Sequence, residues 1–202
     1  VILAFQVQAQ LPTPAPSPAA ELETTVGLTE VEIEYSRPSV RGRDIFSAGG
    51  LVPYGKVWRT GANAATMLTF SEDVVLGGKD LEASSYALLT KPGADEWEVM
   101  LYPYESGNWG SYVDQDPVAA FTVPSANTGH QVETFTIDIN NLRHDGADIN
   151  IMWANTRVTL PLKVHTDKQV KAAFEKMMAG ATAGEYYAMG NYLFESGQDL
   201  EQ

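Results

Sequence analysis

The sequence predicts a mainly β protein, an antiparallel β-sandwich or jelly-roll-like domain followed by a C-terminal helical hairpin. Three observations predict this class. Apolar and polar residues alternate in short segments between about residues 24 and 164, which is the two-residue period of a half-buried strand. Glycine and proline turn signals separate these segments at regular intervals. After residue 164 the apolar residues adopt helical spacing.

The strands follow in order from this alternation. Val31, Ile33 and Tyr35 alternate with polar residues and predict a first strand with one apolar face. Val74–Leu76 precedes a Gly-Gly pair that supplies the positive φ angles of a hairpin. The other strands are predicted at 67–70, 86–90, 97–101, 121–123, 132–139, 149–153 and 158–162, with a turn at Ala154-Asn155 between the last two. Pro161 cannot donate to a ladder, so the last strand is expected to be an edge or to contain a bulge.

Two helices are predicted in residues 165–202. Thr166-Asp-Lys-Gln169 resembles a capping box that opens the first helix, and Gly180 ends it. Its apolar stripe consists of Val170, Phe174, Met177 and Met178. The second helix is predicted from about 183 to 196, with Gly197 in the C′ position. Its Tyr-x-x-Met-Gly-x-x-Leu-x-x-x-Gly pattern approximates the first helix of a tetratricopeptide repeat. The segment is therefore either a helical hairpin packed on the sandwich or the start of a tetratricopeptide-like repeat truncated at residue 202.

The N-terminal residues predict export. Residues 1–5 are apolar, and Val7-Gln8-Ala9 places small residues where a signal peptidase cuts, so we interpret residues 1–9 as a signal peptide remnant. Residues 10–23 are rich in proline and predict an extended linker before a β-sandwich domain at 24–164. The expected location is periplasmic or secreted. The alternative is an apolar N-terminus on a cytosolic protein.

Composition excludes several classes of function. The net charge of −13 argues against a nucleic-acid partner, which would need a broad basic face. The chain has no cysteine, so it has no disulfide, thiolate metal site or cysteine nucleophile. After the first residues, no segment approaches the ~20 apolar residues of a membrane span.

Sequence motifs of catalysis are absent, so we assign no catalytic residue, metal ligand or cofactor. The chain has three histidines, none in a motif, and it has no nucleophile elbow, zinc helix or phosphate-binding loop. Three carboxylate pairs remain, and in a strand two residues that are i and i+2 share a face. The pairs are Glu32/Glu34, Glu96/Glu98 and Asp114/Asp116. In so acidic a chain, the solvated face of a sheet is the favoured interpretation.

A cationic stretch on this acidic chain, residues 35–70, is the candidate ligand site. It carries five cations against one acid, Asp44, and residues 45–70 contain no acidic residue. A guanidinium presents a planar fork suited to carboxylate, phosphate or sulfate. Tryptophan offers a face for stacking on a sugar, and Thr and Asn add hydrogen bonds. A second aromatic cluster at 102–112 looks like a loop able to stack on a sugar. The candidate ligand-binding residues are Arg37, Arg41, Arg43, Trp58, Arg59, Thr60, Asn63, Trp109 and Tyr112.

A structural role explains the same residues. The cations would then pair with Glu32, Glu34 and Asp73, Arg59 would hold loop carbonyls, and Trp58 would lie in the core. The aromatic residues of 102–112 would pack against the end of the sandwich. The sequence supports both interpretations.

Three segments resemble the domain-of-unknown-function family 2911. They are residues 35–43 (Tyr-Ser-Arg-Pro-Ser-Val-Arg-Gly-Arg), 51–63 (Leu-Val-Pro-Tyr-Gly-Lys-Val-Trp-Arg-Thr-Gly-Ala-Asn) and 133–138 (Glu-Thr-Phe-Thr-Ile-Asp). The resemblance covers about 24–164 and implies an exported protein of Bacteroidetes-type bacteria. It also implies that some members of the family carry helical extensions. It implies no activity, but it makes Arg37, Arg59 and Asn63 family features. Residues 81–86 depart from the family, which usually has a proline and a glycine in that turn.

Three functions follow as hypotheses. The first is a non-catalytic binding module for a small anion or an acidic glycan, held by the cationic stretch. The second is a scaffold that meets protein partners through the C-terminal helices. The third is a hydrolase, which needs sheet carboxylates in a cleft beside Arg59. The balance favours a protein that is not an enzyme.

Overall fold

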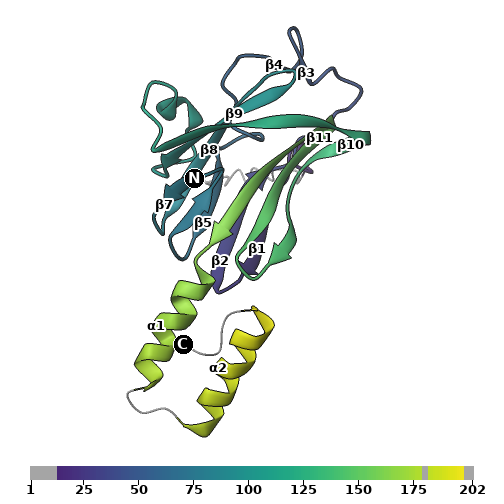
Figure 1. The fold of residues 1–202 in the computed structure, drawn as a ribbon. Helices are drawn as coiled ribbons and strands as arrows, with labels where there is room; N and C mark the ends of the chain where they lie inside the picture. Colours follow the sequence, from purple (N-terminus) through teal and green to yellow (C-terminus); the bar gives the residue numbers. More distant parts are fainter. Residues whose placement is uncertain (1–12, 179–181, 198–202) are drawn as a thin grey trace, which may run out of the picture.

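The computed structural model describes residues 13–178 and 182–197, and in these the strands form one nine-stranded antiparallel sheet and a small two-stranded parallel one (Figure 1). The strands are β1 (Ala19–Val26), β2 (Thr29–Ser36), β3 (Phe46–Ser47), β4 (Val52–Pro53), β5 (Thr66–Phe70), β6 (Val74–Leu76), β7 (Lys79–Leu81), β8 (Ser85–Pro92), β9 (Glu96–Pro103), β10 (Ala119–Arg143) and β11 (Gly146–Val164). The helices are a 3₁₀ turn (Trp109–Tyr112), α1 (Thr166–Met178) and α2 (Ala183–Glu195). The predicted mainly β, antiparallel class with two C-terminal helices is confirmed. The sheet is continuous in the order β1-β2-β5-β8-β9-β10-β11-β6-β7, so the finer prediction of a sandwich or jelly roll is not confirmed.

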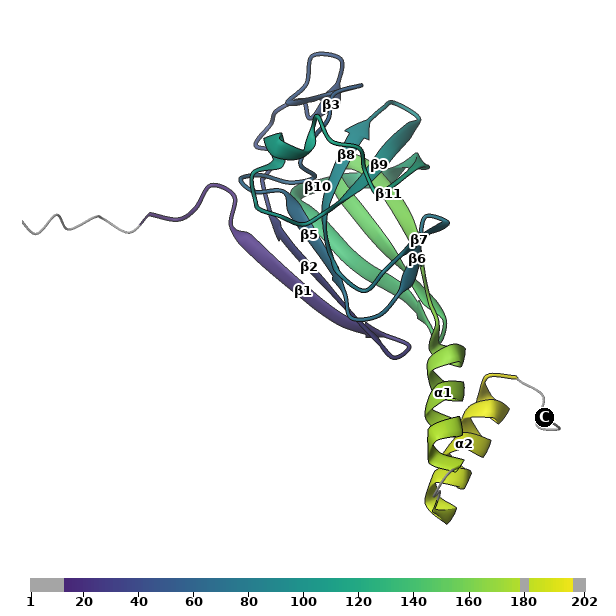
Figure 2. The same cartoon turned by 90° about the vertical axis from the view of Figure 1, so that its left-hand side faces the viewer.

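The sheet folds back on itself because β10 belongs to both of its halves. Residues 119–124 of β10 pair with β9, and the rest of the strand pairs with β11. Figure 2 shows β1 and β2 facing β10 and β11. The Tyr35 hydroxyl of β2 connects the two facing halves. It donates to the Ile137 carbonyl of β10 and accepts from the Ile137 N–H, both at 3.1 Å. The main hydrophobic core lies between the two halves.

The two longest strands were each predicted as two shorter ones. The predicted turn at Ala154-Asn155 is wrong, because β11 continues through it with Ala154 at φ 51° opposite a register shift in β10. An irregularity of this kind bends a strand without ending it. The position of Pro161 agrees with the expected edge: the register of β11 with β10 ends at Val158, and near Pro161 the strand pairs with β6, where the Pro161 carbonyl accepts from Gly77 N–H at 2.9 Å.

Strand β1 begins at Ala19, inside the segment predicted as a linker. It pairs with β2 along its whole length, from Ala19↔Ser36 to Val26↔Thr29. Its inward residues are Ala20, Leu22 and Thr24, which are partly buried, and Val26, which is buried in the core. Two of these four side chains are small or polar, so the alternation is too weak to predict a strand from hydrophobicity alone.

Like charges oppose each other across the β1–β2 pair, since Glu21 pairs with Glu34 and Glu23 with Glu32. Partial burial, and then the charges of Glu21, Glu34 and Glu23, raise the pKa of Glu32 above its ordinary value. A raised carboxyl pKa means that ionisation disfavours the folded state, so the free energy of unfolding falls as pH rises through that pKa.

We expect Glu23→Lys to stabilise the sheet by about 0.5 kcal/mol at neutral pH, because it places opposite charges directly across the pair. Urea unfolding checks this, with Glu23→Gln as the control that removes repulsion without adding attraction. An unfolding midpoint for Glu23→Lys at or below that of wild type would contradict the account.

The two helices project from the end of the sheet, and their residues are little buried (Figures 1 and 2). The predicted capping box at 166–169 does not form: the Thr166 hydroxyl donates to the His144 carbonyl at 2.5 Å, and the Gln169 Oε1 atom has no partner in the described part of the chain. Glu185 Oε2 instead accepts from the Thr182 N–H at 2.6 Å and caps α2. Gly197, at φ 70°, occupies the predicted C′ position. The predicted end at Gly180 lies outside the described residues.

One side-chain hydrogen bond joins the helices, from the Tyr192 hydroxyl to Asp167 Oδ1 at 2.5 Å. Partial burial, together with this bond and the Asp167 charge, raises the pKa of Tyr192 to about 12. Over the described residues, neither helix has the length and apolar content that crossing a lipid bilayer requires.

Candidate functional site

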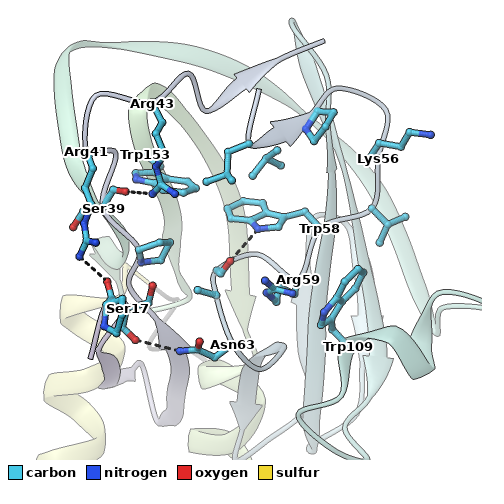
Figure 3. Close-up of a pocket in the computed structure, with 18 residues that line it drawn as sticks. Ser17, Ser39, Arg41, Arg43, Lys56, Trp58, Arg59, Asn63, Trp109 and Trp153 are labelled. Atoms are coloured by element: carbon cyan, nitrogen blue, oxygen red, sulfur yellow. Dashed lines mark hydrogen bonds between the residues drawn. The ribbon is translucent and has the colours of Figure 1, made fainter. Parts of the chain in front are cut away.

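A cleft of about 490 Å³ opens where the long loop between β2 and β5 meets the sheet (Figure 3). This volume lies within the ~300–1,000 Å³ of ordinary small-molecule sites. The loop supplies most of the lining, and the N-terminal segment, the 3₁₀ turn and β11 supply the rest. The charged and aromatic lining residues are Arg41, Arg43, Lys56, Trp58, Arg59, Trp109 and Trp153.

Trp58 forms the floor of the cleft and is also part of the core, with 9% of its surface exposed. Its ring stacks on Trp153 at 5.9 Å between centroids and 15° between planes. It meets three further rings edge-on, those of Phe46, Trp97 and Phe135. Its indole N–H donates to the Gly61 carbonyl at 3.0 Å. The core role predicted as the alternative for Trp58 is therefore observed, and the same ring faces the cleft.

A tight turn after Trp58 sets the direction of Arg59. Thr60 (φ 55°) and Asn63 (φ 59°) both have positive φ, a conformation that costs a β-branched residue about 1–3 kcal/mol. The fully buried Thr60 hydroxyl lies 3.0 Å from Thr90 Oγ1, and the Thr60 carbonyl accepts from Thr66 Oγ1 at 2.6 Å. These bonds hold the turn. Thr60, a predicted ligand residue, does not line the cleft and acts on its geometry through the backbone.

The Arg59 side chain has no hydrogen bond or ion pair to any described residue. Its Nε atom is buried, and its guanidinium carbon lies 5.4 Å from the centre of the Trp109 ring. Stacking on an aromatic face orients a guanidinium without using its N–H donors. The carbonyl clamp predicted as the alternative for Arg59 is therefore not observed, and its donors are available to a ligand.

The other three arginines of the predicted site, Arg37, Arg41 and Arg43, make different numbers of hydrogen bonds that hold the loop. Arg37 donates from Nε to the Phe135 carbonyl at 3.1 Å and from Nη2 to Thr136 Oγ1 at 3.0 Å, and it does not line the cleft. Arg43 donates from Nε to the Val40 carbonyl at 3.0 Å and from Nη2 to the Ser39 carbonyl. Arg41 donates from Nη2 alone, to the Pro16 carbonyl at 3.2 Å. Arg41 and Arg43 both line the cleft with donors to spare.

The predicted ion pairs between this stretch and Glu32, Glu34 or Asp73 do not form. Within 13–178 and 182–197 the salt bridges are Lys91–Glu98 and Arg143–Asp148, both outside the cleft. Glu133 accepts the backbone N–H of Arg41 at 2.9 Å but is not a lining residue. No Asp or Glu is among the described residues that line the cleft, so the lining carries positive charge alone and the acid/base pair of the hydrolase hypothesis is missing there.

The N-terminal segment forms one rim of the cleft. The Asn63 Nδ2 group donates to the Ser17 carbonyl and to Ser36 Oγ, both at 3.2 Å. These two bonds, together with the bond from Arg41 to the Pro16 carbonyl, hold the N-terminal segment beside Arg41 and Arg43 (Figure 3). The sequence did not predict Pro16, Ser17 or Trp153 as site residues, because only the tertiary fold brings them to the loop.

Of the second aromatic cluster, only Trp109 lines the cleft. Tyr112 is fully buried and does not face a ligand site. Its hydroxyl accepts from the backbone N–H groups of Glu105 and Ser106 at 2.9 Å and donates to the Ser106 carbonyl at 2.8 Å. Tyr112 therefore holds the loop that carries Trp109, which is the packing role weighed as its alternative.

A family model described as a protein of unknown function (DUF2911) matches residues 17–162, which is 146 of the 202 residues. The chain belongs to the DUF2911 family. The resemblance predicted from the sequence is thereby confirmed. The DUF2911 segment spans the sheet almost completely and contains every charged and aromatic residue of the cleft, but not α1 or α2. No curated protein and no solved structure matches the chain.

Proposed function

We propose that this DUF2911 domain is a non-catalytic binding module for a small organic anion, with a fragment of an acidic glycan as the leading candidate. The observation that carries the proposal is the charge of the cleft: three arginines and a lysine line it, without a carboxylate among the described lining residues. This concentration of positive charge occurs on a chain of net charge −13. Fixed N–H donors around an unfilled cleft favour a negatively charged ligand.

The size of the cleft favours a ligand larger than an inorganic ion. The cleft, at about 490 Å³, is many times larger than the space that one water molecule needs. A single sulfate or phosphate would leave most of that space wet. The rings of Trp58, Trp109 and Trp153 border the space, and aromatic rings pack against the apolar faces of sugars.

A thermal-shift titration with sodium galacturonate, at constant ionic strength and with galactose as the neutral control, tests the proposal. Binding of the folded state at 100 times Kd stabilises by about 2.7 kcal/mol, or roughly 5–10 °C in a chain of this size. We expect the thermal midpoint to rise saturably with galacturonate and not with galactose. Arg157→Met removes an exposed arginine outside the cleft and should show the same rise as wild type. Equal midpoints with both sugars would contradict the proposal.

Export forms part of the proposal, because it would place the cleft among the glycans of the cell envelope. Support comes from the signal-peptide-like pattern of residues 1–9. Fractionation of cells that express the chain checks this, and recovery of the protein from the cytosol alone would remove it.

A second candidate function is protein interaction through α2. The observation that favours it is the exposure of Tyr187 (72%) and Phe194 (75%) on a helix with a tetratricopeptide-like pattern. Such a helix needs another amphipathic helix against its apolar side, and in a solution of the pure chain that helix is α2 of a second copy. A thermal midpoint that rises with protein concentration in wild type, and not in Tyr187→Ser/Phe194→Ser, is the expected result. Identical, concentration-independent midpoints would contradict it.

A further inference from the structure

The arginines of the cleft lie in two groups. Arg41 and Arg43 belong to the loop directly after β2, whereas Arg59 follows β4. Figure 3 shows Arg41 and Arg43 beside Ser17 and Trp153, and Arg59 nearer Trp109. The Lys56 side chain also borders the cleft, but in that view it extends away from all three arginines.

Both groups keep donors that the protein does not use. A guanidinium carries N–H donors on all three of its nitrogens. In the described part of the chain, Arg43 donates from two nitrogens, Arg41 from one and Arg59 from none. The side-chain acceptors of Arg41 and Arg43 are neutral carbonyls, and Glu133, which accepts from the Arg41 backbone N–H, does not line the cleft, so no carboxylate among the described lining residues pairs with either group.

The buried Nε of Arg59 is a second, independent indication that a ligand completes this site. A buried donor without an acceptor is unfavourable by about as much as a lost hydrogen bond, so such atoms are rare unless a water or ligand satisfies them. The Trp109 ring beside it leaves the rest of the guanidinium directed at the cleft (Figure 3).

From these observations, and resting on the proposed function, we infer that the ligand carries two anionic groups separated by a body that spans Trp58. A monoanion bound to one group leaves the other group without an anionic partner. A second carboxylate held by the other group adds a charge-assisted hydrogen bond, which corresponds to roughly 10–100-fold in affinity. Two adjacent carboxylated sugar rings have this chemistry.

Isothermal titration of the full chain with galacturonate and with digalacturonate, at equal ionic strength, tests the inference. We expect digalacturonate to bind at least about tenfold tighter, beyond the factor of about two that a second identical ring gives statistically. In Arg43→Met and in Arg59→Met, digalacturonate should bind no more than about twofold tighter than galacturonate binds to the same variant. Arg157→Met is the matched control and should retain the full difference.

Equal affinities for the two sugars would overturn the inference of a dianionic ligand and leave the proposed function standing. Absence of binding by both sugars would overturn the proposed function together with this inference. Since Arg43 also braces the loop, Arg41→Met replaces Arg43→Met if that variant loses its thermal transition, and it should likewise abolish the tighter binding of digalacturonate. Full retention of the difference in every cleft variant would contradict the inference.

Discussion

Arg59→Met is expected to weaken the binding of galacturonate about 10–100-fold while the protein stays folded. A hydrogen bond to a charged group contributes about 1.5–3 kcal/mol, and each 1.4 kcal/mol is about a factor of ten in Kd. The fold should tolerate the change, because Arg59 makes no side-chain hydrogen bond or ion pair to the described residues. Methionine keeps an apolar chain against the Trp109 ring. Isothermal titration and a thermal melt of the same sample measure both effects.

Arg157→Met is the control for the loss of one positive charge, since Arg157 is exposed and lies outside the cleft. It should bind galacturonate like wild type. If Arg59→Met lowered stability by several kcal/mol without changing affinity, Arg59 would be a structural residue.

Trp58→Ala is expected to destabilise the protein by about 3–5 kcal/mol, the usual range for removing a buried tryptophan. That corresponds to roughly 6–20 °C in the thermal midpoint of a chain of this size. The cause is the number of partners lost: the stacked Trp153 ring, three edge-on rings, and the indole bond to the Gly61 carbonyl. Urea unfolding at neutral pH gives the value.

Trp109→Ala is the matched control, because it removes the same side chain from the opposite side of the cleft. Trp109 is only partly buried and contacts Arg59, so its loss should reduce affinity more than stability. Equal destabilisation by the two substitutions would show that Trp58 does not anchor the floor as described.

Regular alternation with strong apolar residues made most of the sheet predictable. Val31, Ile33 and Tyr35 were all expected on one face and are all buried. The inward face of β1 alternates Leu22 and Val26 with Ala20 and Thr24, whose burial contributes little, so the strand was missed. Ala154 resembled a turn because a positive-φ residue within a strand and a residue in a chain reversal look alike in sequence.

The candidate site was predictable where it depends on local charge. The cleft cations and Trp58 come from a single loop, and the absence of acids from residues 45–70 is visible in the sequence. Arg37 and Tyr112 could not be separated from true lining residues, because their hydrogen bonds to Phe135 and Ser106 exist only in the folded chain. Trp153 and Pro16 reach the cleft only through the packing of β11 and the N-terminal segment.

Nuclear magnetic resonance titration of the ¹⁵N-labelled chain with sodium galacturonate is the most direct test of the claim that the cleft binds an anion. The side-chain N–H signals of Arg59 and Trp109 report from the cleft, and that of Arg157 from outside it. The account predicts saturable shifts of the Arg59 and Trp109 signals with one dissociation constant, and none for Arg157 or in a galactose titration. Unchanged Arg59 and Trp109 signals at saturating galacturonate would contradict it.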